Sequence, residues 1–225
     1  MAAIESRTIA AEVHGRYLVR PGVGVAPHPL LVGFHGYGET AEAHLEKLLH
    51  IPGQSAFVVV SIQSLHLFYT RAREVVGSWM TRQDREHAIA DNVRYVAGVV
   101  ARVKEEFGAG GRLVYAGFSQ GAAMAYRAAA RSGHECHGVL ALGGDVPPDV
   151  ADDPSVRLPS VLVVRGERDE WFTAEKLERD RARLRERAAS TRVVVFAGGH
   201  EWAEPVFDAA GAFLREVLAE PPRGG

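Results

Sequence analysis

The sequence predicts an α/β fold, with a mostly parallel, twisted sheet of about seven strands that is covered by helices on both faces. Short runs of apolar and β-branched residues recur along its 225 residues, and such continuous runs are typical of strands buried in a parallel sheet. Longer segments with apolar residues at three- and four-residue steps separate these runs, as expected for crossover helices. The length suits one domain over residues 1–225, without room for a large cap domain.

Six apolar runs are predicted to form the buried strands, and another candidate segment precedes them. The six are LLVGF (30–34), FVVVSI (57–62), RLVYAGF (112–118), HGVLALGG (137–144), SVLVVRG (160–166) and RVVVFAGG (192–199). The earlier segment EVHGRYLVRP (12–21) is a candidate for an antiparallel edge pair. Two stretches, roughly 62–80 and 143–159, are predicted to be irregular, and both follow the carboxyl ends of strands, where open α/β sheets bind ligands. We therefore expect these stretches to form the walls of a pocket.

Four helices are predicted between and after these strands. Apolar residues repeat at helical spacing up to Phe107, and Gly108 is placed to end that helix. Thr173 is a candidate N-cap, and Pro205 suits the first turn of the last helix. The predicted helices span 84–107, 119–131, 173 to about 187, and 205 to a point before Pro221, and residues 220–225 are expected to be frayed.

Composition and charge exclude several classes of partner. The formal net charge is -2, so there is no basic excess that would attract nucleic acid or an anionic membrane. Cys136 is the only cysteine, which excludes an internal disulfide and favours a reducing compartment. The N-terminus lacks the basic-then-apolar order of a signal peptide, and no apolar run approaches the length of a membrane span. These features predict a cytoplasmic protein that acts on a small molecule and does not span a membrane.

The stretch GFSQGAAM (117–124) is a candidate nucleophile site. A predicted strand precedes Ser119 and a predicted helix follows it, which is the strand, sharp turn and helix context of a nucleophilic serine. The glycines at 117 and 121 fit a turn too tight for side chains, and a helix start favours developing negative charge. The alternative is that Ser119 is an ordinary helix cap.

A serine nucleophile needs a base and an acid, in the chain order Ser, acid, His. His200 follows the strand VVVFAGG and is the candidate base, whereas the other nine histidines are interpreted as solvated or structural. Asp169, in VVRGERDEWF, is the favoured acid because a tight glycine turn after its strand leads to it, and Asp145, in LALGGDVPPD, is the alternative. The HECH group (134–137) does not match a zinc spacing, so no metal is predicted there.

Acyl transfer also requires hydrogen-bond donors for the oxyanion. The backbone amide of Gln120, directly after the candidate nucleophile, is the first. The second is predicted in GFHGYGET (33–40), where glycines let the backbone turn its amides toward the site, with the amide of Tyr37 as the donor. The alternative for this loop is a plain glycine turn between a strand and a helix.

These motifs together resemble the α/β-hydrolase superfamily and, within it, the phospholipase/carboxylesterase family that includes acyl-protein thioesterases and small bacterial esterases. The similarity runs from about Leu30 to Phe213 and rests on FHGYGE (34–39), GSWM (77–80), GFSQGA (117–122), RGERDEW (165–171) and GGHEW (198–202). The resemblance implies an α/β-hydrolase fold. It also implies Ser119, Asp169 and His200 as a catalytic triad, with the amides of Tyr37 and Gln120 as the oxyanion hole.

The sequence departs from the pattern of that family at three places. Glu39 stands where an aspartate is common, and Arg165 replaces the histidine that often precedes the glycine of the acid turn. Trp171 and Phe172 add bulk beside the candidate acid. Bulky apolar residues either narrow the acyl pocket or pack in the core, and the candidates for the substrate pocket are Trp79, Leu67, Phe68 and Trp171.

The sequence therefore predicts a serine hydrolase that cleaves carboxylic esters of small or medium acyl chain through an acyl-enzyme, without a metal or organic cofactor. A thioesterase, or a lactone or dienelactone hydrolase, would use the same residues, and a non-catalytic binding protein with this fold is the alternative of another class. The expected partner is a small-molecule ester. A homodimer, in which a partner chain covers the uncapped site, is compatible with the sequence.

Overall fold

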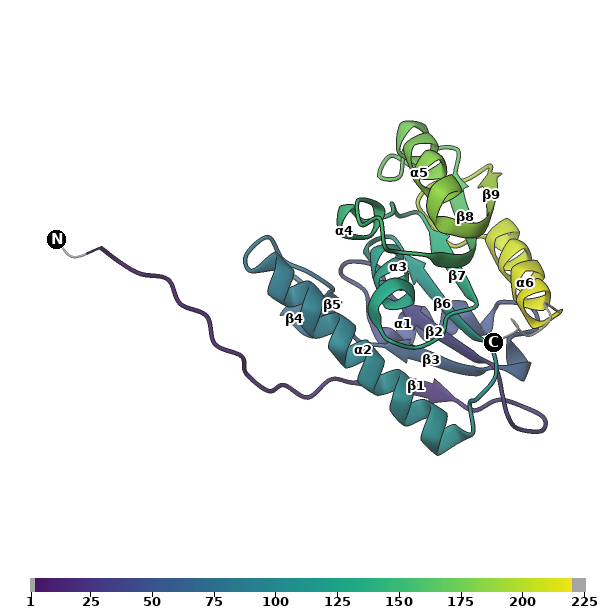
Figure 1. Cartoon of the computed structure of the whole chain (residues 1–225), viewed down its shortest axis with the longest axis horizontal. Coiled ribbons are helices and arrows are strands. Elements are labelled where there is room, and N and C mark those ends of the chain that lie inside the picture. Colours follow the sequence, from purple (N-terminus) through teal and green to yellow (C-terminus); the bar gives the residue numbers. More distant parts are fainter. Residues whose placement is uncertain (1–2, 220–225) are drawn as a thin grey trace.

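The computed structural model describes residues 3–219 and shows a seven-stranded sheet between two layers of helices (Figure 1). The strand order is β1-β3-β2-β6-β7-β8-β9, and all neighbours are parallel except β1, which runs antiparallel to β3. The strands are β1 (Tyr17–Arg20), β2 (Leu30–Phe34), β3 (Val58–Ile62), β6 (Leu113–Phe118), β7 (Gly138–Leu142), β8 (Leu158–Gly166) and β9 (Ala188–Phe196). The predicted sheet is confirmed with all six strands, although β9 is an edge strand and largely exposed rather than buried. EVHGRYLVRP contributes one edge strand rather than a pair.

The described chain also forms six α-helices and one short 3-10 helix, η1 (Gln54–Ala56). The α-helices are α1 (Ala41–Leu49), α2 (Arg85–Phe107), α3 (Gln120–Arg131), α4 (Pro148–Ala151), α5 (Ala174–Arg187) and α6 (Glu204–Ala219). As predicted, Thr173 caps α5 with its side chain, and Gly108 ends α2 at a φ of 61°. None of these helices is long and apolar enough to cross a membrane. The predicted fraying of 220–225 lies outside the described residues.

The sheet separates two apolar cores. Alternate residues of a strand point to opposite faces, so Leu30 and Val32 of β2 lie in one core and Leu31 lies in the other. Helices α2, α3, α4 and α5 cover the first face, and α1 and α6 cover the second. Because β2 is buried on both faces, its sequence is apolar throughout, and this property made the strand recognisable.

A separate hairpin forms within the stretch 62–80, so the prediction that this stretch is irregular is wrong. Strands β4 (His66–Tyr69) and β5 (Val75–Ser78) pair antiparallel. The turn between them, TRARE (70–74), is charged and lacks the Asn-Gly type of hairpin signal. The sequence pattern therefore did not predict the hairpin. The stretch 143–159 is irregular as predicted except for the single turn of α4 and its last two residues, where β8 begins.

The start of α3 packs against the sheet through direct backbone contact. A Cβ atom added to Gly117 would lie 2.1 Å from the carbonyl oxygen of Gly121. A Cβ atom added to Gly121 would lie 2.0 Å from the carbonyl oxygen of Phe34 in β2. Atoms in folded proteins do not approach so closely, so both positions require glycine for a steric reason. The turn between β6 and α3 therefore has a fixed position relative to β2.

We predict that Gly121→Ala lowers the free energy of unfolding by about 3 kcal/mol or more, because its methyl group must push α3 away from β2. The matched control is Gly98→Ala, at a helical position where an added Cβ meets nothing within 4 Å. That change should stabilise the protein by about 0.5 to 1 kcal/mol. Urea unfolding of both variants makes the measurement. Equal stability of the Gly121→Ala variant and the unaltered protein would show that α3 is free to move away from β2.

Candidate active site

Ser119 occupies the sharp turn between β6 and α3 in a strained backbone conformation. Its φ is 54° and its ψ is −117°, a region that residues with a side chain rarely adopt and that costs of order 1–3 kcal/mol. Its amide donates a hydrogen bond of 2.8 Å to the carbonyl of Leu142 in β7, which holds the turn. The Ser119 side chain makes no capping hydrogen bond to α3. The interpretation of Ser119 as an ordinary helix cap is therefore wrong.

His200 and Asp169 form a pair at the same edge of the sheet, after β9 and β8 respectively. Nδ1 of His200 lies 2.8 Å from Oδ2 of Asp169. The other carboxylate oxygen, Oδ1, accepts hydrogen bonds from the amides of Trp171 (2.9 Å) and Phe172 (2.8 Å). With Asp169 as the acceptor, the proton of neutral His200 is assigned to Nδ1, and Nε2 is left with its lone pair.

The glycine pair after β7 lies between Ser119 and the His200–Asp169 pair. A Cβ atom added to Gly143 would be 2.9 Å from Cε1 of His200 and 3.3 Å from Oδ2 of Asp169. A Cβ atom added to Gly144 would be 2.3 Å from the carbonyl oxygen of Ser119. The structure therefore brings together three residues that are separated by 50 and 31 positions along the chain.

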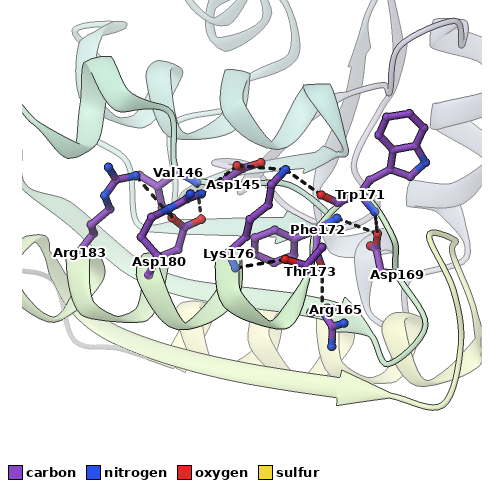
Figure 2. Close-up of polar contacts among 11 residues, drawn as sticks. Asp145, Val146, Arg165, Asp169, Trp171, Phe172, Thr173, Lys176, Asp180 and Arg183 are labelled. Atoms are coloured by element: carbon purple, nitrogen blue, oxygen red, sulfur yellow. Dashed lines mark hydrogen bonds and ion pairs between the residues drawn. The ribbon is translucent and has the colours of Figure 1, made fainter.

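Asp145, the alternative acid, lies elsewhere. Its carboxylate pairs with Arg179 at 3.1 Å and with Lys176 at 3.6 Å, both on α5. Figure 2 shows the Lys176 side of this pairing. Figure 2 shows Asp169 at the far end of the same row of side chains, beyond Trp171. Of the two candidates, Asp169 is the carboxylate that the structure places against His200.

Arg165 holds the turn that carries Asp169. Its guanidinium is buried, and Nε donates to the carbonyl of Phe172 at 2.7 Å while Nη2 donates to the carbonyl of Glu167 at 3.1 Å. These bonds join the two ends of the turn from Glu167 to Phe172 (Figure 2 shows the Phe172 side). Five donors in a rigid fork allow an arginine to bridge two carbonyls that a histidine would not reach together.

The loop from Gly36 to Glu39 follows β2 and is anchored at both ends. Oε2 of Glu39 accepts a hydrogen bond of 2.6 Å from the amide of Gly36, and burial raises the pKa of this carboxyl. Gly38 and Glu39 exchange backbone hydrogen bonds of 2.9 and 3.0 Å with Gly77 of β5. Within residues 3–219, the amides of Tyr37 and Gln120 donate to no other group, so both remain available to a ligand.

The side chain of Gln120 connects α3 to the hairpin, a role that the sequence did not reveal. Its Oε1 accepts hydrogen bonds from the amide of Trp79 (2.7 Å) and from Oγ of Ser78 (3.3 Å). The Trp79 indole donates to the carbonyl of His35 at 2.8 Å and is fully buried in the core. Trp79 was predicted to line the substrate pocket, but the structure packs its ring in the core, 5.3 Å from the ring of Phe34 between centroids, and it is not among the residues that line the Ser119 pocket.

His35 supports the same loop from within the core. Its Nδ1 donates to the carbonyl of Gly36 at 2.7 Å, and its Nε2 accepts from the amide of Ser64 at 3.1 Å and from Gln63 at 3.0 Å. Burial lowers the pKa of His35 to about 4, so the ring is neutral at pH 7. A neutral ring can donate and accept at once, and this arrangement uses both capacities.

Ser119 opens into a pocket of about 280 Å³. Of the residues predicted to form a substrate pocket, Trp171 lines it and is 74% exposed. Leu67 lines a different hollow together with Arg16 and Val75, and its assignment to the substrate pocket stays a prediction. Phe68 stacks on the ring of Tyr37 at 5.2 Å between ring centroids. Both stretches predicted to form pocket walls contribute lining residues, Met80 from 62–80 and residues 143–148 from 143–159. The lining residues that the sequence did not indicate are Arg85, Ala123, Arg127 and Lys176.

The sheet order, the serine turn after β6 and the acid and histidine after β8 and β9 define an α/β-hydrolase. The family model for phospholipase/carboxylesterase matches residues 23–217, and the chain belongs to this family of esterase-type hydrolases. Among curated proteins, none matched the chain. Within residues 3–219, no group of three His, Cys, Asp or Glu side chains is arranged to hold a metal ion.

Solved structures share the fold at low sequence identity. Esterase PE8 is 23% identical with a TM-score of 0.70, and the alignment covers 92% of this chain and 100% of that chain. The Bacillus cereus carboxylesterase is 16% identical with a TM-score of 0.71, covering 90% and 94%. A phospholipase/carboxylesterase from Dyadobacter fermentans is 19% identical with a TM-score of 0.68, covering 91% and 97%.

We predict that His35 makes stability fall in mild acid. Its pKa is about 4 in the folded protein against an ordinary value of 6.5, so the unfolded chain takes up the proton first as pH falls. The contribution of neutral His35 to the free energy of unfolding is complete above about pH 6.5 and is lost as pH falls through 4. Between pH 6.5 and 4, the unaltered protein should therefore lose about 2 to 3 kcal/mol more of its free energy of unfolding than the His35→Gln variant loses.

Urea unfolding of the unaltered protein and of His35→Gln at pH 7.0, 5.5 and 4.5 makes this measurement. The exposed His87 provides the matched control, because His87→Gln removes a histidine without removing a buried one. Parallel stability curves for His35→Gln and the unaltered protein would contradict the assignment.

Proposed function

We propose that this protein is a serine hydrolase that cleaves carboxylic esters of small or medium acyl chain, with Ser119 as nucleophile, His200 as base and Asp169 as the orienting acid. The observation that carries the proposal is the strained Ser119, whose hydroxyl is not used to cap α3 and which lies beside a hydrogen-bonded His–Asp pair. Strain of this kind persists where the surrounding structure enforces it, and it is concentrated at active sites. Membership in the phospholipase/carboxylesterase family supports the same reaction.

In the first half of the proposed reaction, Nε2 of His200 takes the proton of the Ser119 hydroxyl as its oxygen attacks the ester carbonyl. The carbonyl electron pair moves onto its oxygen, which the amides of Tyr37 and Gln120 stabilise. The tetrahedral intermediate then collapses, the bond to the alcohol oxygen breaks, and His200 gives its proton to that oxygen. The products are the free alcohol and an ester between the acyl group and Ser119.

In the second half, His200 takes a proton from water as the water attacks the acyl-enzyme, and returns the proton to Ser119 as the acid leaves. Asp169 holds the imidazole with Nε2 toward the serine and stabilises its cation. The two amides that bind the other oxygen of Asp169 keep this carboxylate in place.

Thioesters and lactones present the same carbonyl to the same residues, so they are alternative substrates rather than alternative mechanisms. The pocket of about 280 Å³ supports substrates of modest size. Comparison of kcat/KM for matched oxygen esters, thioesters and lactones ranks the three classes.

We predict that Ser119→Ala lowers the kcat for p-nitrophenyl butyrate by about 10⁴-fold or more, because no other group is placed to form the acyl-enzyme. A fluorophosphonate probe should label the unaltered protein and leave the variant unlabelled. A binding protein without an activated serine would show neither turnover nor labelling, and an active Ser119→Ala variant would contradict the nucleophile assignment.

We predict that Asp169→Asn lowers kcat by about 10⁴-fold, since an amide at this position favours the wrong tautomer of His200. Asp145→Asn serves as the comparison, because Asp145 pairs with α5 and not with His200, and it should cost far less. Steady-state kinetics with p-nitrophenyl butyrate distinguish the two. A larger loss for Asp145→Asn would reverse the choice of acid.

A further inference from the structure

Arg127 is a fully buried cation at the pocket that contains Ser119. Its side chain is 0% exposed, and it follows Gln120 by seven residues and Ala123 by four, so the three lie on one face of α3 and all line this pocket. It follows Ser119 by eight residues, a rise of about 12 Å along a helix. The Cα–Cβ bonds of a helix tilt toward its N-terminus, the end of α3 at which Ser119 lies.

The guanidinium of Arg127 has one nitrogen without a partner. Nε donates to both oxygens of Asp149, at 3.2 and 3.0 Å, and Nη2 donates to Oδ1 at 2.7 Å. Nη1 is buried and makes no hydrogen bond to any residue within 3–219. Buried polar groups in folded proteins are nearly always paired, and a charged group left unpaired costs more than a neutral one.

Asp149 is not available for this nitrogen. It also accepts a hydrogen bond of 3.1 Å from Nη1 of Arg131. Burial opposes its ionisation, but the hydrogen bonds and charges of the two arginines outweigh burial and lower its pKa. The carboxylate of Asp153, 3.8 Å from Arg131, lies on the outer side of the cluster. An acceptor for Nη1 of Arg127 must therefore come from another source.

The charged side chains that line the pocket are mostly positive. The charged lining residues are three cations, Arg85, Arg127 and Lys176, and one anion, Asp145. Asp145 is already paired with Arg179 and Lys176. Arg85 contacts the sulfur of Met80 and has no carboxylate partner among the ion pairs of residues 3–219. Arg127 is paired with Asp149 and Lys176 with Asp145, so Arg85 is the lining cation left in excess near the proposed nucleophile.

We propose that the Ser119 pocket selects esters whose acyl or alcohol part carries a carboxylate, which Arg127 binds through Nη1 while Arg85 and Lys176 attract it. This inference rests on the proposed function. A carboxylate on Arg127 would complete the hydrogen bonding of the guanidinium and form a charge-assisted bond, which is roughly twice as strong as a neutral one. The ester would then be held with its carbonyl toward Ser119.

Two matched substrate pairs test the proposal. For the acyl side, p-nitrophenyl hydrogen adipate is compared with p-nitrophenyl methyl adipate, which differs only in a methylated carboxylate. For the alcohol side, 4-acetoxybenzoate is compared with its methyl ester. In at least one pair the carboxylate form should have a kcat/KM about tenfold higher or more, mainly through KM. The preference should shrink in 1 M NaCl. Spontaneous hydrolysis is subtracted with Ser119→Ala.

Variants separate binding by Arg127 from a merely structural role. Arg127→Gln should abolish the preference in the favoured pair. Arg131→Gln is the matched control, because Arg131 shares Asp149 but is not among the residues lining this pocket, and it should retain the preference. If Arg127→Gln does not fold, the double variant Arg85→Gln/Lys176→Gln should reduce the preference, with KM for the carboxylate ester raised more than kcat is lowered.

Several outcomes would overturn the inference while leaving the proposed function intact. Equal kcat/KM within both pairs does so, as does an equal loss of preference in the Arg127 and Arg131 variants. A turnover-free measurement addresses the pocket separately: monomethyl adipate should bind the Ser119→Ala variant in an NMR titration and bind the Ser119→Ala/Arg127→Gln variant more weakly. Absence of binding contradicts the carboxylate site, whereas binding without hydrolysis of any ester contradicts only the proposed function.

Discussion

The backbone contact between the first turn of α3 and the end of β2 is the constraint on which the site depends. Gly121 touches the carbonyl of Phe34, and Gly117 touches the carbonyl of Gly121. These contacts fix the position of the backbone between β6 and α3. Ser119 takes a positive φ because the residues on both sides are already fixed. The energy that holds this strain comes from the packing of α3 and β6 in the two cores, far from any reacting atom.

The same geometry gathers the other functional groups at one edge of the sheet. Parallel strands end on the same side, so the residues after β2, β6, β7, β8 and β9 meet there even though they are distant along the chain. Short-range hydrogen bonds then hold several of these segments: two amides hold Asp169, Arg165 holds the turn that carries it, and β5 holds the Gly36–Glu39 loop. The sheet sets the approximate place of every group, and these short-range bonds set its orientation.

The sequence allowed five buried strands and the long helices to be predicted, because burial on two faces requires continuous apolar runs and helices carry periodic ones. The run in β9 also marked a strand, but this strand lies at the edge of the sheet and is largely exposed. The hairpin was missed because its strands are short and its turn is charged. Ser119, Asp169 and His200 were identified from their order after successive strands, and the structure brings them together. Their catalytic roles remain a proposal.

The pocket was less predictable than the proposed triad. Trp79 and Trp171 are both large and aromatic, yet Trp79 is fully buried and Trp171 is exposed, and composition does not distinguish these outcomes. Arg127 stands in an alanine-rich helix with no motif around it. Its significance depends on which nitrogen Asp149 leaves unpaired, and that depends on three-dimensional contacts between α3 and α4.

The hydrogen bonds of the Gln120 side chain limit how the hairpin can be altered without affecting the proposed oxyanion donors. The amide of this residue faces the proposed oxyanion position, while its side chain holds Ser78 and Trp79 at the base of the hairpin. The hairpin in turn pairs with the loop that carries Tyr37. Remodelling the hairpin to admit a new substrate would therefore displace both proposed donors. Mutations in the hairpin would therefore change substrate selectivity and reaction rate together. Mutations that change selectivity alone must lie on the opposite side of the pocket, around α4 and α5.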